Sequence, residues 1–180
     1  MSENSPHPEL HCRCPESYPS WDGTDQSLAG QTVHRMSIAS FFHMPLAYES
    51  YVGKQLENVE QLGLSEKWPG FVLTKTGMWG GEIIRFIEDA ETASRCVQIL
   101  PPPFDVNVML HEGGIGTVQK TLRAQQMKIV DSGKKPKELY LAYLSCPVCA
   151  ERKGGEKILL FRRWLTSERL VKKIEQRASK

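Results

Sequence analysis

The sequence lacks any long apolar run. Its 180 residues are 40% hydrophobic, yet no stretch approaches the roughly 20 apolar residues that a membrane-spanning helix requires. The first ten residues, MSENSPHPEL, are polar and contain no hydrophobic region of the kind that a secretory signal peptide carries. We therefore expect a cytoplasmic protein without a membrane partner.

The cysteine content is too low for a disulfide scaffold. The chain has five cysteines, an odd number, and a chain of this length can bury a core without disulfide staples. Both facts favour a reducing cytoplasm over a disulfide framework. The cysteines are better explained by metal binding or thiol chemistry in a reducing compartment.

The net charge is only +2, but the charge is unevenly distributed. Residues 157–180 hold eight Lys or Arg against two Glu, whereas residues 1–60 hold three Lys or Arg against eight Asp or Glu. A solvated basic helix at the C-terminus explains this pattern most simply. The alternative is that this basic C-terminal helix binds nucleic acid or another anionic partner.

Nucleotide-binding motifs are missing too. No Gly-Lys-Ser/Thr sequence is present, and Gln119 stands where a dinucleotide fingerprint has its third glycine. A strand–glycine–helix junction nevertheless occurs at Gly113, Gly114, Gly116 and Thr117. Backbone N–H groups at such a junction can bind a small-molecule anion, and the alternative is a plain tight turn.

The most informative stretch is 138–164, in which two apolar, strand-favouring runs flank Cys146-Pro-Val-Cys149. Gly154 and Gly155 follow, and glycine adopts the positive φ that a returning chain requires. This pattern predicts a hairpin with a cysteine-bearing connection. It resembles one half of a zinc ribbon, in which two such turns supply four thiolates.

A second cysteine pair is available only near the N-terminus, at Cys12 and Cys14. Four thiolates are a common structural zinc set, so we expect zinc bound by Cys12, Cys14, Cys146 and Cys149. The wide separation and the single spacer residue depart from the zinc-ribbon pattern. Three alternatives stay open: His11 replaces one cysteine, Cys146 and Cys149 form a redox pair, or the cysteines are inert.

The interleaving of helices and hairpins predicts an α+β fold with a mixed or mainly antiparallel sheet covered by helices. We expect residues 1–31 to be an irregular segment tethered by Cys12 and Cys14, and residues 32–180 to form one domain. No internal repeat is evident. The expected order is strand 32–42, helix 46–62, hairpin 70–87, helix 88–100, strand 104–110, helix 117–130, hairpin 138–164 and helix 165–177.

Histidines occur at several expected strand ends. An extended chain would hold His34 and His43 about 30 Å apart, so these two cannot share a site unless the strand bends. His43 with His111 and Glu112 is geometrically easier and would form an acid–base or metal centre. The alternative is that these are unrelated surface or core residues.

These patterns favour a zinc-binding α+β protein that holds a small molecule or a macromolecular partner beside its sheet. Two enzymes are the alternatives. One uses His43, His111 and Glu112, and the other is a thiol–disulfide oxidoreductase that uses Cys146 and Cys149.

Overall fold

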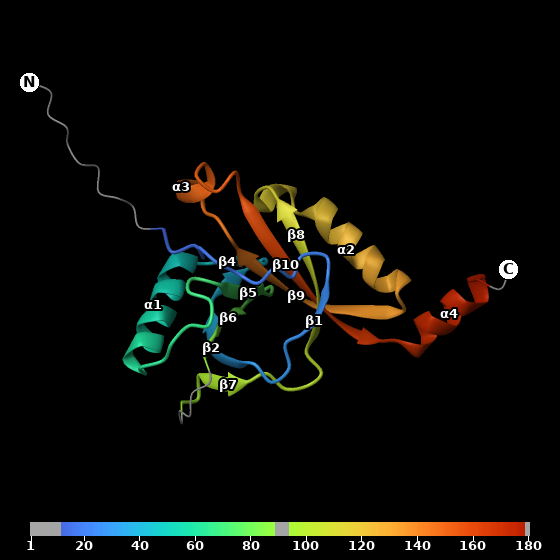
Figure 1. The fold of residues 1–180 in the computed structure, drawn as a ribbon, viewed down its shortest axis with the longest axis horizontal. Coiled ribbons are helices and arrows are strands. Elements are labelled where there is room, and N and C mark those ends of the chain that lie inside the picture. The colour runs from blue at the N-terminus through green and yellow to red at the C-terminus, as the bar shows by residue number, and fades with distance from the viewer. Residues whose placement is uncertain (1–11, 89–93, 179–180) are drawn as a thin grey trace, which may run out of the picture.

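The structure is a computed structural model that describes residues 12–88 and 94–178. It is an α+β fold in which one curled antiparallel sheet of eight strands carries helices (Figure 1). Across the sheet the strands follow the order β1 (Asp25–Ser27), β8 (Asp105–Glu112), β10 (Lys157–Thr166), β9 (Lys134–Tyr143), β5 (Val72–Thr76), β6 (Gly81–Phe86), β2 (Thr32–Ile38) and β7 (Val97–Ile99).

The remaining elements connect or extend these strands. Two short strands form a separate hairpin, β3 (Ser40–Phe41) and β4 (Met44–Pro45). The helices are α1 (Tyr48–Gln61), α2 (Gln119–Asp131), α3 (Pro147–Ala150) and α4 (Glu168–Ala178), with a 3-10 turn η1 (Ile115–Thr117) before α2. None of the described helices is long and apolar enough to cross a membrane.

The sheet is built from two units of the same connectivity. β2, α1, β5 and β6 form the first unit, with strand order β2-β6-β5, and β8, α2, β9 and β10 form the second, with order β8-β10-β9. The units meet at an antiparallel contact between β5 and β9, where Thr74 faces Leu141. One β–α–β–β arrangement thus occurs twice in the chain, and no sequence periodicity indicates it.

A buried glutamine joins helix to sheet in each unit. In the first, Nε2 of Gln55 on α1 donates to a carbonyl of β2 at 3.0 Å and to one of β6 at 3.3 Å. In the second, Nε2 of Gln125 on α2 donates to carbonyls of β8 and β10 at 2.9 and 3.1 Å. Both side chains are fully buried, so an unpaired amide at either position would be costly.

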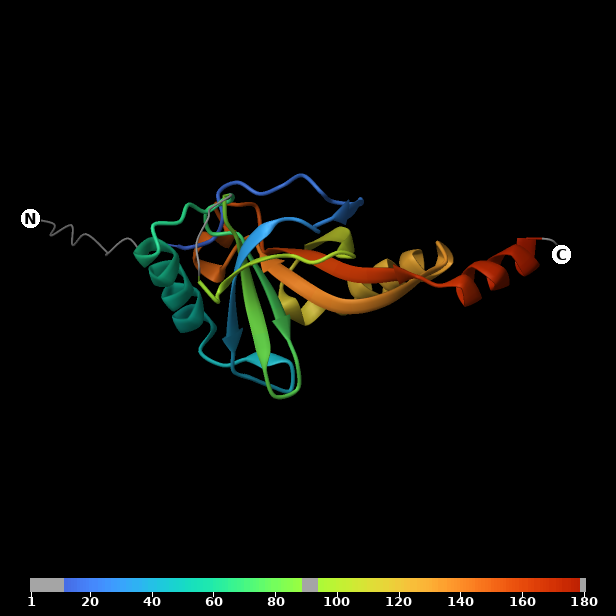
Figure 2. The ribbon, with the colours of Figure 1, turned by 90° about the horizontal axis from the view of Figure 1, so that it is seen from below.

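Alternation along the strands divides the core into two layers. In β10, Ile158 and Leu160 pack under α2, while Leu159 and Phe161 join the main core on the opposite face. The segment before β1 crosses that opposite face (Figure 2). There its Trp21 packs edge-on against other aromatic rings.

The predicted α+β class and the antiparallel sheet are confirmed. The predicted helix over residues 88–100 is wrong for its described part, since Val97–Ile99 is strand β7, paired with β2. Residues 89–93 lie outside the described residues. The backbone of Leu100 donates to Gln31 across the sheet edge, and a β-branched pair flanking Gln98 suits an edge strand. The tertiary pairing therefore overrides the helical pattern.

Candidate functional site: a four-cysteine cluster beside a cavity

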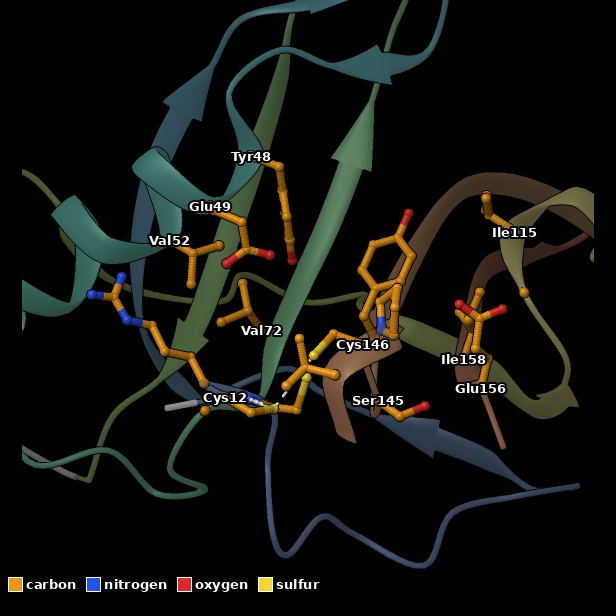
Figure 3. Close-up of a pocket in the computed structure, with 17 residues that line it drawn as sticks. Cys12, Tyr48, Glu49, Val52, Val72, Ile115, Ser145, Cys146, Glu156 and Ile158 are labelled. Atoms are coloured by element: carbon orange, nitrogen blue, oxygen red, sulfur yellow. Dashed lines mark hydrogen bonds between the residues drawn. The ribbon is translucent and has the colours of Figure 1, made fainter. Parts of the chain in front are cut away.

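Four cysteines from two distant parts of the chain come together. Sγ atoms of Cys12, Cys14, Cys146 and Cys149 all lie within 4.8 Å of one another. Sγ of Cys12 and Sγ of Cys146 are 3.5 Å apart, and those of Cys146 and Cys149 are 3.8 Å apart. Figure 3 shows Cys12 and Cys146 side by side. The four cysteines could therefore hold one metal ion.

Local backbone geometry aims these thiols at one point. Cys146 caps the short helix α3, and its backbone N–H donates to Sγ of Cys149 at 3.3 Å. In the N-terminal segment the N–H of Cys14 donates to Sγ of Cys12, also at 3.3 Å. Backbone donors stabilise negative charge on sulfur. The cluster is therefore prepared for thiolates rather than for four neutral thiols.

The spacing and chemistry of the cluster fit a tetrahedral ion. Zinc–sulfur bonds of about 2.3 Å place the sulfur ligands about 3.8 Å apart, close to the separations of 3.5 and 3.8 Å found here. None of the five cysteines is in a disulfide. Soft thiolate ligands in a tetrahedral set are typical of zinc or iron. His11, the alternative ligand, lies outside the described residues.

Burial alone would leave much of this cluster protonated. It raises the pKa of the Cys12 and Cys14 thiols above the ordinary value of 9.0. At Cys146 burial also acts to raise the pKa, but hydrogen bonds from the Cys149 backbone and from the Cys12 thiol outweigh it and lower the pKa to about 7. A bound cation would favour the thiolate form of all four residues, because coordinated thiols lose their protons.

Other contacts hold the N-terminal segment against the same region. Nζ of Lys153 donates to the carbonyl of Pro15 at 2.6 Å and to that of Leu144 at 3.1 Å. A Cβ built on Gly70 would lie 2.7 Å from the carbonyl oxygen of Arg13. Only glycine allows this close approach of two backbones. The segment is thus fixed at several points around the cysteines.

Beside the cluster lies a cavity of about 700 Å³. It opens between α1, the ends of β5, β9 and β10, and the turn at η1, and the N-terminal segment forms one wall (Figure 3). Its lining consists of Cys12, Arg13, Cys14, Tyr48, Glu49, Val52, Gly70, Val72, Gly114, Ile115, Tyr143, Ser145, Cys146, Pro147, Val148, Glu156 and Ile158. Most of this surface is carbon, with a few polar groups between.

Two tyrosines and two carboxylates supply the polar groups. The rings of Tyr48 and Tyr143 meet edge to face with centroids 5.6 Å apart, and the Tyr48 hydroxyl lies 3.0 Å from that of Thr74. Burial raises the pKa of both phenols above the ordinary value of 10.0, so both stay protonated. Glu49 on α1 extends toward the space, and Glu156 lines the opposite side (Figure 3).

No sequence motif marks these four residues. Tyr48 and Tyr143 fit an apolar helix stripe and an apolar strand. Glu49 fits the acidic first turn of any helix. The cavity depends on the space that neighbouring elements leave open, which no local pattern encodes.

The three residues of the predicted histidine centre have different contacts in the structure. Nδ1 of His43 lies 3.2 Å from a backbone carbonyl of β5. The buried His111 ring contacts hydroxyls of Thr121 and Thr117 at 2.8 and 3.0 Å, and Glu112 follows it at the exposed end of β8. None of the three predicted residues lines the cavity. Their acid–base role stays a prediction.

At the glycine junction, two of the backbone N–H groups already donate hydrogen bonds within the protein. The N–H of Gly113 donates to the carbonyl of Glu156 at 2.7 Å, and that of Thr117 to Gly114 at 3.1 Å. The Glu156 carboxylate lies over Gly114, so that a Cβ there would be 2.2 Å from its oxygen, whereas a Cβ on Gly116 would meet open space. Anion binding at this junction also stays a prediction.

The fold and site define an α+β domain of two β–α–β–β units with a four-cysteine cluster beside a cavity. Two solved structures share this fold. The first is "Crystal structure of EcmrR C-terminal domain", with a TM-score of 0.60, 11% identity and coverage of 79% of this chain and 96% of that chain. The second is "Cryo-EM structure of EcmrR-DNA complex in EcmrR-RPo", with a TM-score of 0.55, 10% identity and coverage of 79% and 57%.

Among curated proteins, none matches this sequence. A family model described as "Bacterial hydrolase" matches residues 4–163. The chain therefore belongs to this family, and the match includes all four clustered cysteines and every residue that lines the cavity.

Proposed function

We propose that the protein binds a small, largely apolar molecule in its cavity, beside a structural zinc site. The observation that carries this proposal is the cavity of about 700 Å³ with an apolar lining and few polar groups. Pockets for small molecules commonly measure about 300–1,000 Å³ and have this composition. The protonated tyrosines supply hydrogen-bond donors, and the carboxylates of Glu49 and Glu156 supply acceptors.

Zinc would be held by Cys12, Cys14, Cys146 and Cys149. Four protein thiolates complete a tetrahedral shell and leave no open position, which is typical of structural rather than catalytic zinc. Bound there, the ion would fix the N-terminal segment as a wall of the cavity. The binding of metal and the shape of the cavity are thereby linked.

The zinc proposal is tested by elemental analysis of purified protein. We expect close to one zinc per chain, and loss of the metal in Cys12→Ser/Cys14→Ser. Cys96→Ser is the matched control, because Cys96 is also a half-exposed free cysteine but lies outside the cluster. Full zinc occupancy in the double variant would refute the shared site. Metal-free protein that reduces insulin through Cys146 would favour the thiol–disulfide oxidoreductase.

The cavity is tested by a thermal-shift screen of small apolar compounds. Ile115 lines the cavity yet is 54% exposed, so Ile115→Trp narrows the space without overpacking a core. A compound that stabilises the wild type should fail to stabilise this variant. Met127→Trp, on an exposed face of α2 outside the cavity, should bind as the wild type does. Equal stabilisation of both variants would contradict the proposal.

A second candidate function is hydrolysis in the same cavity. Membership of the family described as "Bacterial hydrolase" favours it. No described residue that lines the cavity is a histidine. The one lining serine, Ser145, already donates its hydroxyl to the Gly155 carbonyl at 3.1 Å, so the base must be another group. Glu49 is the group we assign as general base. Its carboxylate would take a proton from water as the water oxygen attacks the carbonyl carbon of a bound apolar ester. The ester C–O bond then breaks, and the alcohol leaves with that proton.

Chromogenic esters of increasing acyl length test this candidate. Glu49→Gln should reduce turnover by roughly a hundredfold or more, the usual contribution of a general base. Glu60→Gln is the matched control, because Glu60 is exposed on the same helix and does not line the cavity. Turnover that survives in Glu49→Gln but is lost in His111→Asn would favour the alternative centre at His43, His111 and Glu112.

A further inference from the structure

Positive charge is concentrated in the elements at one end of the fold. Residues 119–138 and 162–176 form α2, the start of β9, the end of β10 and most of α4, and they contain eleven Lys or Arg against four Asp or Glu. Their net charge is therefore +7, whereas the whole chain carries +2 and the remaining residues carry −5. The positive charge thus extends beyond the C-terminal helix over the neighbouring strands and α2.

Ion pairs neutralise only part of this charge. Lys134 pairs with Asp25 of β1, and Arg163 pairs with Glu138 at 3.4 Å. With these pairs set aside, nine cations remain in the two ranges against three acidic residues, Asp131, Glu168 and Glu175. A surplus of positive charge therefore remains at this end of the fold.

Five of the remaining cations lie on the part that projects from the body. Two are on β9, beyond its contact with β5, and three are on α4. We name these five residues the basic arm: Lys135, Lys137, Arg169, Lys172 and Lys173. All five are exposed, and none forms an ion pair with another described residue. Figure 2 shows α4 extending from the end of the β9–β10 ribbon, on the opposite side of the molecule from α1.

One side of α4 packs against the body. Val171 lies next to Gly133, in the turn between α2 and β9, where a Cβ on the glycine would be 2.8 Å from Cγ2 of the valine. Leu170 and Ile174 lie on the same side of the helix and, like Val171, are half-buried. This contact fixes which side of α4 faces solvent.

The solvent side of α4 carries three cations of the arm. Arg169 precedes Lys172 by three residues and Lys173 by four, so the three side chains lie together on one face. At 1.5 Å per residue they span about 6 Å of the helix axis. Glu168 and Glu175 are seven residues apart, which places both on one flank of the helix rather than between the cations.

The arrangement of the arm matches the charge density of duplex nucleic acid. Lys135 and Lys137 are alternate residues of β9, so they share one face of the strand and lie about 7 Å apart. With the cations of α4 they form a surface rather than a single line. The two backbones of a duplex spread their phosphates over a surface, with one negative charge per about 1.7 Å of axis. An extended acidic peptide offers one line of charge, at most one per about 3.3–3.6 Å.

We propose that the basic arm binds the phosphate backbone of duplex nucleic acid. Lys and Arg side chains carry a full positive charge and only hydrogen-bond donors, which suits phosphate oxygens. Contacts to phosphates carry no sequence information, so binding is independent of base sequence. Its strength comes from the release of counterions and therefore falls as the salt concentration rises.

An anionic bilayer is a poorer match for the arm. Helices that lie on membranes bury a free apolar face in the lipid, whereas the apolar side of α4 is turned toward Gly133. Of the twelve exposed large hydrophobic residues in the described part of the chain, only Met127 lies on α2, β9, β10 or α4. The arm thus offers charge without an apolar surface.

Fluorescence anisotropy with short labelled DNA and RNA duplexes of mixed sequence tests the proposal on the full chain. The slope of log K against log salt should approach about −4.5 if all five arm cations contact phosphates. Lys135→Gln/Lys137→Gln should make the slope shallower by about 1.8, and Arg169→Gln/Lys172→Gln/Lys173→Gln by about 2.7. Duplexes of different base sequence should bind within about twofold of each other.

A matched control removes two positive charges elsewhere. Lys54 on α1 and Arg95 are exposed and lie outside the basic elements, so Lys54→Gln/Arg95→Gln should keep the wild-type slope. Because every substituted side chain is exposed, all of these variants should keep the wild-type Tm. Comparison of Tm therefore separates a lost contact from a lost fold.

Three results would overturn the proposal. One is failure of the wild type to bind either duplex at low salt, and another is a wild-type slope in both arm variants. The third is tighter binding to phosphatidylglycerol vesicles or to polyglutamate than to either duplex, which would assign the arm to a lipid surface or an acidic protein.

Discussion

The two buried glutamines make an internal comparison that tests how the helices are held to the sheet. Gln55→Leu and Gln125→Leu remove equivalent amides from equivalent units and replace them with a side chain of similar size. Each change removes two hydrogen bonds from a glutamine Nε2 to strand carbonyls. If the units were energetically alike, the two variants would lose the same stability.

They are not alike, because only one glutamine has a partner for its oxygen. Oε1 of Gln55 accepts from Nε of Arg85 at 3.3 Å, and Arg85 is 1% exposed. Oε1 of Gln125 is buried with no partner among the described residues, as is Nε of Arg162 at the corresponding place on β10. Gln55→Leu therefore leaves a buried arginine N–H unpaired, whereas Gln125→Leu removes an oxygen that already lacks a donor.

The magnitudes follow from this difference. Two lost hydrogen bonds cost about 2 kcal/mol in either variant. Gln55→Leu costs about 2 kcal/mol more, because the Nε–H of the buried Arg85 guanidinium loses its partner while the ion pair with Glu66 stays. Gln125→Leu also removes a buried oxygen that lacks a donor, which stabilises the variant by about 1 kcal/mol and offsets part of the loss. We expect losses of about 4 and about 1 kcal/mol, a difference that corresponds to roughly 6–12 °C in Tm for a chain of this size.

Urea unfolding followed by circular dichroism measures both values, and the slope of each transition checks that the native state stays compact. Equal losses would refute the reasoning, because the arginine contact would then contribute nothing. A larger loss for Gln125→Leu would refute it more strongly.

Two further predictions concern single positions. Burial acts to raise the pKa of Glu82, but hydrogen bonds from its two cationic partners outweigh burial and lower it below the ordinary 4.5. The charged Glu82 carboxylate therefore stabilises the fold above about pH 4.5, and this stabilisation is lost as pH falls through the folded-state pKa. The Tm of Glu82→Gln should be below that of the wild type at neutral pH and equal to it in acid. A Tm difference that persists at low pH contradicts this. Gly70→Ala should cost about 2 kcal/mol in urea unfolding, since Gly70 has a φ of 77° and faces the rigid Arg13 carbonyl. Gly114→Ala, with a φ of −78° and only the flexible Glu156 side chain above it, should change stability by less than about 0.5 kcal/mol.

Much of the fold could be predicted because its signals are local. The apolar residues before Gly63 recur at helical spacing, which predicts a helix. Two apolar runs flank the Cys146 connection, and each predicts one strand. The cysteine cluster was predictable for another reason: four thiols in a chain with few cysteines leave few combinations. Residues 97–99 could not be predicted from local signals, since their strand forms through pairing with β2.

The repeat and the cavity could not be predicted in this way. Gln55 and Gln125 occupy equivalent places, but the residues around them differ enough that no periodicity connects them. Glu49 becomes a candidate base only because α1 stands beside an open space.

The separation of 134 residues between Cys12 and Cys146 affects how the chain is completed during synthesis. A ribosome that adds 5–20 residues per second makes Cys12 roughly 7–27 seconds before Cys146. During that interval the N-terminal segment lacks Cys146 and Cys149 as partners, and Phe161 of β10, against which Trp21 packs, has not been made. Proteolytic removal of this short segment from the folded protein would take away two of the four clustered thiols and one wall of the cavity.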